Sequence, residues 1–397
     1  MPDRFEKSFT QQEPISDAAI ERAAEILRSG RLHRYNVAAG EESEASALER
    51  EYAAWQGANY CLATTSGGQA LQIALRAAGV EPGDMVLANA YTLAPVPGAI
   101  FAVGAVPVLV EIDDSWHTDP DDLETKARES GARFLLLSHM RGHIADMERI
   151  ATICTASGIT MIEDCAHTMG AHWKGTLSGN FGSIACFSTQ TYKHMNSGEG
   201  GLLTTNDAEI AARAVIASGS YMNYAVHGAI PPQEVFQAVR LNVPNCSARL
   251  DNLRAALIRD QLPRLNDNIA RWNIRYRIIE ESLRKAKAVR TVERAQHEAF
   301  VGSSIQFHAD GIAQEKIPHF VRACGERGVE IKWFGADEPV GFTSRFDSWH
   351  YLGDPPHLPQ TRSALSTTCD MRIPLTFDED DCRVIGEILA DCSRAFA

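Results

Sequence analysis

The stretch "FSTQTYKHMNSGEGGLL", from Phe187 to Leu203, places a single lysine, Lys193, between an apolar run and a glycine cluster. A lysine in a partly desolvated pocket has a lowered pKa, which makes its neutral amine available as a nucleophile or as an imine-forming base. Glycines allow the backbone to approach a ligand closely. An ordinary surface lysine is the alternative, and the neighbours Tyr192 and His194 do not decide between the two.

A second candidate for chemistry is Asp164, which closes the apolar run "TMIED". A carboxylate at that position costs free energy unless a partner neutralises it, and a protonated ring nitrogen is one such partner. A cap on a neighbouring helix or a pair with an arginine would also satisfy it. Asp164 alone therefore does not indicate a cofactor site, and other groups are needed to support that interpretation.

The third candidate is the turn Ser66-Gly67-Gly68 in "TTSGGQAL", directly before a helical pattern. Free N–H groups and the positive end of a helix suit a phosphate dianion, although small residues at such a turn also have a purely steric explanation. A phosphate cradle, a carboxylate for a ring nitrogen and an imine-forming lysine are together the three attachments that pyridoxal 5′-phosphate (PLP) needs. The combination is far more specific than its parts.

Seven apolar runs predict the strands that must position these residues. Their continuous apolarity, without strict alternation, is typical of sheet strands that are covered on both faces, and helical patterns lie between most of them. The runs are residues 60–66, 84–90, 106–112, 133–140, 160–166, 183–189 and 201–206. The pattern predicts an α/β fold with a mostly parallel sheet, in which ligands bind beyond the carboxyl ends of the strands.

After about Asn206 the sequence changes in character. A long helical stretch over residues 247–286 is interrupted near Pro263, and the tail mixes short strands with helices. We predict a large α/β domain over residues 1–250, with the N-terminal segment included. We predict a linking helix and a smaller α+β domain over residues 251–397, and the length of the chain also favours two domains.

Composition restricts the class of protein. The chain has 397 residues, 45% hydrophobic and 22% charged, and a formal charge of −13, which argues against a nucleic-acid partner. No apolar run approaches the roughly 18 residues that span a membrane. The nine cysteines include no CxxC pair, so we expect reduced, mostly buried thiols and no metal site. A cytoplasmic enzyme is the expectation.

The sequence resembles the DegT/DnrJ/EryC1/StrS aminotransferases, the sugar aminotransferase branch of the fold-type I PLP-dependent enzymes. The motifs that carry the resemblance include "TSGGQALQIALRAAGVEPGDMV", "IEDCAHTMGAHWKG" and "GNFGSIACFSTQTYKHMNSGEGGLLTTND". The resemblance implies that Lys193 binds PLP covalently and that Asp164 partners the pyridinium nitrogen. It implies that His167 lies near the cofactor ring and that Ser188, Gly67 and Gly68 bind the phosphate. A relative with histidine in place of this lysine would resemble a sugar dehydratase, so Lys193 favours amino transfer.

The chain departs from the family pattern at several positions. Gly68 replaces a threonine of the family, and Leu93 replaces an aromatic residue, which leaves Tyr91 as a candidate to stack on the cofactor ring. The loop that enters the neighbouring subunit's site in the family keeps Arg249 and has Ser247 at an asparagine position. The resemblance therefore implies a homodimer with shared sites, to which Asn245, Ser247 and Arg249 contribute. The alternative is that Arg249 pairs with Asp251 or Glu234 of its own subunit.

The resemblance implies a biosynthetic aminotransferase. An amino acid, glutamate or glutamine, is the expected amino donor, and a keto-sugar or keto-cyclitol is the expected acceptor. The unusual aromatic segments within residues 331–360 either shape a different acceptor pocket or pack on the surface. The alternatives are a related enzyme with a non-sugar substrate and a non-catalytic PLP-binding regulator. A nicotinamide dehydrogenase is disfavoured because "SGEGGLL" lacks the third glycine of the G-x-G-x-x-G fingerprint.

Overall fold

The computed structural model describes residues 4–397, and its centre is a seven-stranded sheet in the order β1-β9-β8-β5-β4-β2-β3. The strands are β1 (Tyr60–Thr64), β2 (Met85–Asn89), β3 (Val106–Val110), β4 (Phe134–Ser138), β5 (Thr160–Asp164), β8 (Ile184–Ser188) and β9 (Gly201–Thr205). Strand β9 is antiparallel to both of its neighbours, and the pairs from β8 to β3 are parallel. The predicted α/β class and the seven predicted strands are confirmed.

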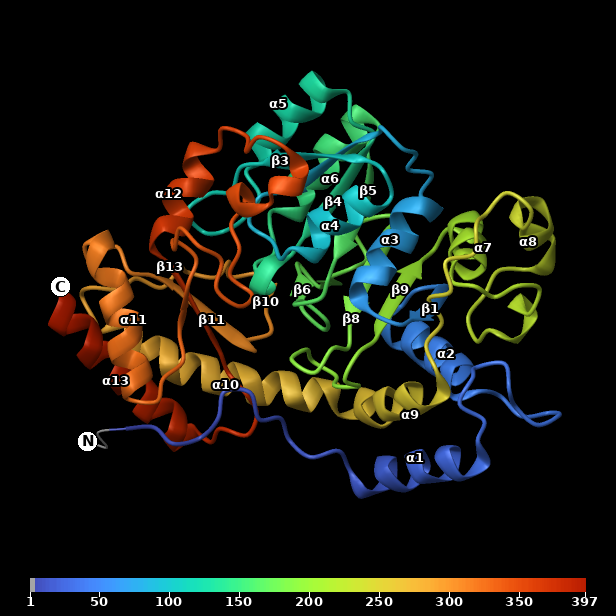
Figure 1. Cartoon of the computed structure of the whole chain (residues 1–397), viewed down its shortest axis with the longest axis horizontal. Helices are drawn as coiled ribbons and strands as arrows, with labels where there is room; N and C mark the ends of the chain where they lie inside the picture. Colours follow the sequence, from blue (N-terminus) through green and yellow to red (C-terminus); the bar gives the residue numbers. More distant parts are fainter. Residues whose placement is uncertain (1–3) are drawn as a thin grey trace.

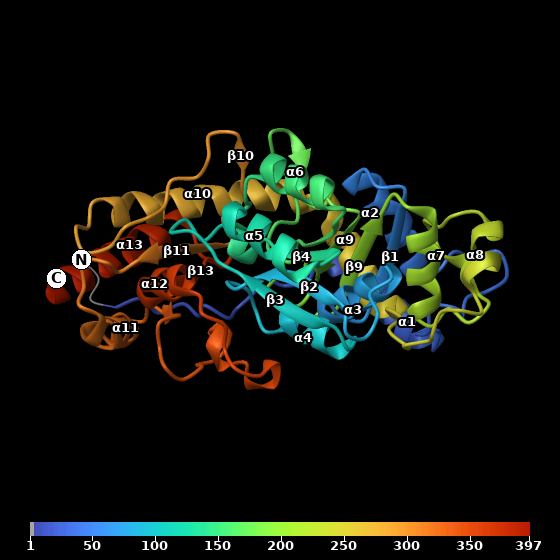
Figure 2. The ribbon, with the colours of Figure 1, turned by 90° about the horizontal axis from the view of Figure 1, so that it is seen from above.

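Helices cover both faces of this sheet (Figure 2). Successive side chains of a strand point to opposite faces, so Leu136 of β4 belongs to one core while Leu135 and Leu137 belong to the other. The first core is covered by α3 (Gly67–Ala77), α4 (Pro95–Ala102), α7 (Ala208–Ala217) and α8 (Gln233–Val239), and the second by α5 (Pro120–Ser130) and α6 (Met147–Ser157). Burial on both faces explains why the strands are apolar throughout.

A long helix leads out of the large α/β part. Helix α9 (Asn252–Gln261) is separated from α10 (Leu265–Arg284) by a short 3-10 turn that contains Pro263. Proline has no N–H to donate to the preceding turn, which explains why the α-helix is interrupted at Pro263, as predicted. Helix α10 then runs below the sheet towards the C-terminal lobe (Figure 1).

The C-terminal lobe has its own antiparallel sheet in the order β11-β13-β12. Its elements are β11 (Ser304–His308), α11 (Ile317–Glu326), β12 (Lys332–Trp333), α12 (Pro359–Thr367), β13 (Thr368–Arg372) and α13 (Glu379–Phe396). A second small sheet consists of β6 (His172–Trp173), β7 (Thr176–Leu177) and β10 (Glu298–Ala299). The α+β character expected for the tail is present.

The N-terminal segment touches both lobes. The rings of Phe5 and Phe9 pack against Phe377 with centroid distances of 5.0 and 4.9 Å, within the C-terminal core. The predicted division assigns this segment to the large domain, and Figure 1 shows its first described residues beside the C-terminal lobe. The division at residue 250 stays a prediction.

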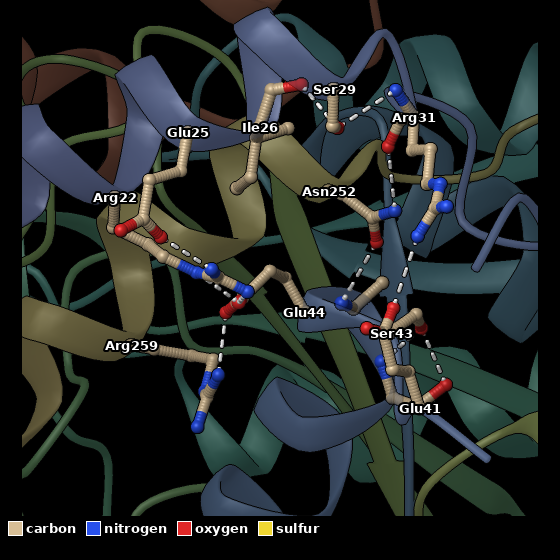
Figure 3. Close-up of polar contacts among 12 residues, drawn as sticks. Arg22, Glu25, Ile26, Ser29, Arg31, Glu41, Ser43, Glu44, Asn252 and Arg259 are labelled. Carbon is tan, nitrogen blue, oxygen red and sulfur yellow. Dashed lines mark hydrogen bonds and ion pairs between the residues drawn. The ribbon is translucent and has the colours of Figure 1, made fainter. Parts of the chain in front are cut away.

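Glu44, the first residue of α2 (Glu44–Gln56), forms ion pairs with both α1 (Asp17–Ser29) and α9 (Figure 3). The carboxylate of Glu44 lies 2.6 Å from Arg22 Nη2 and 2.5 Å from Arg259 Nη1. The Asn252 amide donates to the Arg31 carbonyl at 3.1 Å and accepts from the Ala45 N–H at 3.4 Å. These contacts fix the N-terminal helix against the large lobe.

Among residues 4–397, none of the helices has both the length and the apolar character needed to span a membrane. All nine cysteines carry free thiols, and eight of them are buried. Cys246 is the exposed one.

Candidate active site

A cavity of about 450 Å³ opens at the carboxyl ends of the central strands. Seven residues that the sequence analysis singled out for cofactor binding line it: Ser66, Gly67, Gly68, Asp164, His167, Ser188 and Lys193. They come from segments far apart in the chain and converge because β1, β5 and β8 end at the same edge of the sheet. This cavity is the candidate active site.

Lys193 lies in the turn that follows β8, and its Nζ is 2.7 Å from Nε2 of His167. Burial, together with the charge of Arg141, lowers the pKa of Lys193 to about 7. Burial also lowers the pKa of His167 well below its usual value, and the charge of Lys193 adds to that effect. Near neutral pH a large fraction of the Lys193 amine is therefore unprotonated and nucleophilic.

This pKa predicts how Lys193 reacts with an electrophile such as acetic anhydride. In cofactor-free protein, the rate of its modification should rise through about pH 7, because the neutral amine is the reactive form and its pKa is lowered. For an ordinary exposed lysine, the rate of modification rises only near the unperturbed pKa of about 10.4. Peptide mass spectrometry of partially labelled protein measures both profiles at once. A Lys193 profile that coincides with those of the exposed lysines would contradict the lowered pKa.

Asp164 ends β5 and is only 8% exposed. Its Oδ2 accepts a hydrogen bond from Ser138 Oγ at 2.8 Å, and its Oδ1 accepts one from the Ala166 N–H at 3.1 Å. Both contacts fix the carboxylate at the wall of the cavity. The carboxylate is thus positioned where it could pair with a cationic ring nitrogen.

The residue before it, Glu163, anchors the strand from the other face. Its carboxylate accepts from the N–H groups of Gly179, Phe181 and Gly182 at 3.0, 2.8 and 2.6 Å. It also lies 3.1 Å from Nε2 of His139, and both side chains are buried. Glu163 and His139 lie close enough to Cys165 to form a possible metal site, but the three N–H donors already explain the position of the Glu163 carboxylate. That this protein has no metal site stays a prediction.

The N-terminus of α3 borders the same cavity. Ser66 caps the helix, since its Oγ accepts from the Gln69 N–H at 3.1 Å. Within residues 4–397, no group accepts a hydrogen bond from the N–H of Gly67 or Gly68. A Cβ at Gly67 would lie 2.9 Å from Cβ of Ser188, so glycine is what allows the helix to start this close to that hydroxyl. Free N–H donors, the helix end and Ser188 suit a phosphate.

The cavity therefore has donors for a phosphate, a carboxylate for a ring nitrogen and an amine for an aldehyde. These groups fit PLP in the way that the sequence implied.

Tyr91, the candidate for ring stacking, does not line the cavity. Its side chain is 1% exposed, and its ring packs edge-on against Phe334 at a centroid distance of 5.3 Å. Leu93 lines the cavity instead, at the position where the family has its aromatic residue.

Two arginines line the cavity that the sequence analysis did not single out. Arg141 has a left-handed backbone (φ 55°), and its Nη2 lies 2.7 Å from Oδ2 of Asp370. Arg372 ends β13, with its guanidinium 3.7 Å from the centre of the Tyr192 ring. Arg141 follows the apolar run of residues 133–140, so the signal that pointed to Asp164 would have found it as well. Arg372 follows "STTCDM", which is not an apolar run and carries no such signal.

Part of the aromatic segment within residues 331–360 lines the cavity, and part of it is buried in the core, where the sequence analysis had considered surface packing. Gly341, Phe342 and Ser344 line the cavity. Phe346 and Trp349 are buried in the core beneath α3 and α4. The segment thus connects the C-terminal lobe to the large lobe across the edge of the cavity.

A model of the DegT/DnrJ/EryC1/StrS aminotransferase family matches residues 14–389 of the chain. The chain belongs to this aminotransferase family. It is 32% identical to the 3-amino-5-hydroxybenzoate synthase of Amycolatopsis mediterranei over 240 residues, which cover 59% of this chain and 60% of that one. It is 32% identical to the L-glutamine:scyllo-inosose aminotransferase of Streptomyces griseus over 258 residues, with 64% and 60% covered. A pleiotropic regulatory protein of Geobacillus stearothermophilus is 34% identical over 229 residues, with 57% and 56% covered.

The match thus spans 60% or less of the length of these curated relatives. The structural likeness is more complete. The crystal structure of a 3-amino-5-hydroxybenzoic acid synthase has a TM-score of 0.83 and 25% identity, with 99% of this chain and 100% of that chain covered. Spr1654 of Streptococcus pneumoniae in its PLP form has a TM-score of 0.81 and 18% identity, with 97% and 98% covered. The family's fold therefore extends over nearly the whole chain.

The loop that this family's pattern places in a neighbouring site does not line the cavity of its own subunit. Asn245 Oδ1 accepts from the Ser247 N–H at 3.0 Å, and Arg249 Nη1 donates to the Gly219 carbonyl at 2.8 Å. Asp251, one of the two acids considered as a partner for Arg249, pairs with Arg254 at 2.6 Å instead. Arg249 forms no ion pair within the described chain, residues 4–397.

Proposed function

We propose that this protein uses PLP to move an amino group from an amino acid to a keto acceptor in a biosynthetic pathway. The observation that carries the proposal is the placement of a partly buried lysine with a pKa of about 7 in one cavity with Asp164 and the N-terminus of α3. The donor is glutamate or glutamine, and the acceptor is a keto-cyclitol or keto-sugar. The glutamine:scyllo-inosose relative supports this choice.

Each cavity residue has a proposed role. Lys193 holds the cofactor covalently, Asp164 holds the proton on the ring nitrogen, and His167 lies beside the ring. Gly67, Gly68 and Ser188 bind the phosphate. The free N–H groups at the start of α3 support the phosphate assignment, and the Ser138 hydrogen bond at 2.8 Å supports that of Asp164.

PLP, when bound, supplies a reactive carbonyl and a ring that accepts the electrons released when a substrate Cα–H bond breaks. The protein supplies the proton transfers. The Lys193 amine, freed when the amino donor takes its place, would accept the proton from the substrate Cα and give it back; its pKa near 7 suits both directions. Asp164 would hold the proton on the ring nitrogen. The same residues would serve the amination of the acceptor in the reverse direction.

Isotope transfer tests the proposed function. With L-glutamate labelled with ¹⁵N at the amino group and scyllo-inosose as acceptor, we expect ¹⁵N in an aminated cyclitol, measured by mass spectrometry. A panel of keto-sugars in parallel defines the acceptor class. Loss of the label to ammonia, with every acceptor unchanged, would argue against amino transfer.

A non-catalytic regulator is the second candidate, because a pleiotropic regulatory protein is among the relatives. Such a protein would bind PLP without turning over amino donors. The lysine and aspartate in one cavity favour the enzyme, since a regulator has no need of a proton carrier.

We also infer a homodimer in which the loop with Asn245, Ser247 and Arg249 completes the partner's active site. Asn245 and Ser247 are exposed. Large apolar side chains are exposed nearby, with Tyr221 at 59% and Leu241 at 84%. Apolar exposure of this kind marks an interaction surface. A twofold pair is the commonest closed assembly.

Subunit complementation tests the shared site. Inactive Lys193→Ala protein mixed with inactive Arg249→Ala protein should regain activity after subunit exchange, because the hybrid dimer has one site with both residues intact. The matched control is Lys193→Ala mixed with Asp164→Asn, whose residues belong to one subunit's cavity and which should not complement. Exchange without recovery in the first mixture would place Arg249 outside the partner's site.

We propose a cytoplasmic location as well. Nine free thiols, including the exposed Cys246, are compatible with a reducing compartment.

A further inference from the structure

Arg372 lines the cavity without an ion-pair partner among residues 4–397; the nearby charge of Asp370, which already pairs with Arg141, favours its charged form but does not offset burial and the charge of Arg141. The other arginine, Arg141, pairs with Asp370 at 2.7 Å. Of the lining carboxylates, Asp164 is held by Ser138 and Ala166, and Glu199 is exposed. No carboxylate of residues 4–397 forms an ion pair with Arg372, although it is a lining residue and is partly buried. A partly desolvated cation without a counter-ion is unfavourable unless a ligand supplies one.

Aromatic rings fix the orientation of this guanidinium. Its carbon lies 3.7 Å from the centre of the Tyr192 ring and 5.2 Å from that of Phe342. Contacts with ring faces stabilise a cation without using its N–H groups. The guanidinium also makes one polar contact with the Tyr192 side chain, and it has more N–H donors than that contact uses. The planar fork of an arginine matches the two oxygens of a carboxylate. The residue is also held at the end of β13, the central strand of its sheet.

A second cation reinforces the positive charge. Lys332 Nζ lies 4.7 Å from the centre of the Phe342 ring. Burial, with the charges of Arg372 and Arg141, lowers its pKa to about 8. An anion bound between the lobes would reduce the charge repulsion that Lys332 experiences from Arg372 and Arg141. The charge of Arg372 also helps to lower the pKa of Lys193, and both residues line the cavity, so an anion on Arg372 would lie near the reactive amine.

We propose that Arg372, held by Tyr192 and Phe342 and flanked by Lys332, is the carboxylate-binding residue of this cavity. The inference rests on the proposed function and specifies it: a substrate of this site carries a carboxylate. The carboxylate belongs either to the amino donor and its 2-oxo product or to the keto acceptor, since both half-reactions use one cavity. In either case Arg372 orients the substrate relative to Lys193.

Binding to cofactor-free protein tests the subsite without turnover. Glutarate should bind at least about tenfold more tightly than the neutral glutaramide, as expected for hydrogen bonds to a charged group. Arg372→Gln should abolish that preference, and Arg372→Lys should retain part of it. Arg254→Gln, which removes an exposed arginine of α9 outside the cavity, should leave it unchanged. Calorimetric titration measures affinity, and thermal unfolding of each variant shows that it is folded.

An unchanged glutarate preference in folded Arg372→Gln protein overturns the proposal. The source of the carboxylate is then assigned with loaded protein. A loss of about tenfold or more in kcat/KM for L-glutamate, with amination of the neutral scyllo-inosose unaffected, identifies the donor. A loss confined to a carboxylated ring ketone, 3-oxocyclohexane-1-carboxylate, identifies the acceptor. Failure of amino transfer in the wild type would refute the proposed function. The glutarate titration would still test Arg372, because it measures binding without turnover.

Discussion

Lys193→Ala should abolish the covalent attachment of PLP and reduce amino transfer by about four orders of magnitude or more. The variant removes both the nucleophile that holds the cofactor and the amine that carries the proton. Borohydride treatment of the loaded wild type should fix PLP on the peptide that contains Lys193. The variant should show no fixed cofactor, even where it retains PLP through the phosphate and Asp164.

The matched control is Lys285→Ala, which removes an exposed lysine paired with Glu281 at 2.8 Å. Its attachment of PLP and its turnover should equal those of the wild type. If borohydride still fixes the cofactor on another lysine of the Lys193→Ala protein, with turnover preserved, the assignment of Lys193 is wrong.

Asp164→Asn is expected to lower kcat by about two to three orders of magnitude, equivalent to about 3–4 kcal/mol of transition-state stabilisation. Asparagine keeps the size of the side chain but removes the charge that keeps the ring nitrogen protonated. The cofactor should still be fixed on Lys193 by borohydride, which separates loss of catalysis from loss of binding.

Ser138→Ala provides the graded comparison. It removes the 2.8 Å hydrogen bond to Asp164 and keeps the carboxylate, so a decrease of about tenfold is expected. Steady-state kinetics should show a larger decrease in kcat for Asp164→Asn than for Ser138→Ala. Turnover of Asp164→Asn close to that of the wild type would remove Asp164 from the mechanism.

The central sheet and much of its site were predictable from sequence for one physical reason. A strand buried on both faces must be apolar along its whole length, so the residue that ends the apolar run marks the edge where ligands bind. Asp164 and Ser188 end such runs, and Lys193 follows in the next turn. The helix after Ser66 was predictable from its cap and its glycines.

Features that depend on contacts between distant segments were not predictable in this way. Arg372 comes from the C-terminal lobe and reaches the cavity only because the two lobes pack together. Tyr91 lies within the same short segment as Leu93, and which of the two faces the cavity depends on how the chain turns after β2. Phe5 and Phe9 carry no local signal that they pack beside Phe377.

The donor half-reaction tests the central claim most directly. PLP-loaded protein is mixed with L-glutamate or L-glutamine without any acceptor, while absorbance and released 2-oxo acid are followed. The account predicts that the visible absorbance of the bound cofactor disappears as one equivalent of 2-oxo acid forms per site, and that a keto acceptor restores it. A protein that binds PLP through Lys193, yet releases no 2-oxo acid with any proteinogenic amino acid, would contradict amino transfer and leave the regulator as the explanation.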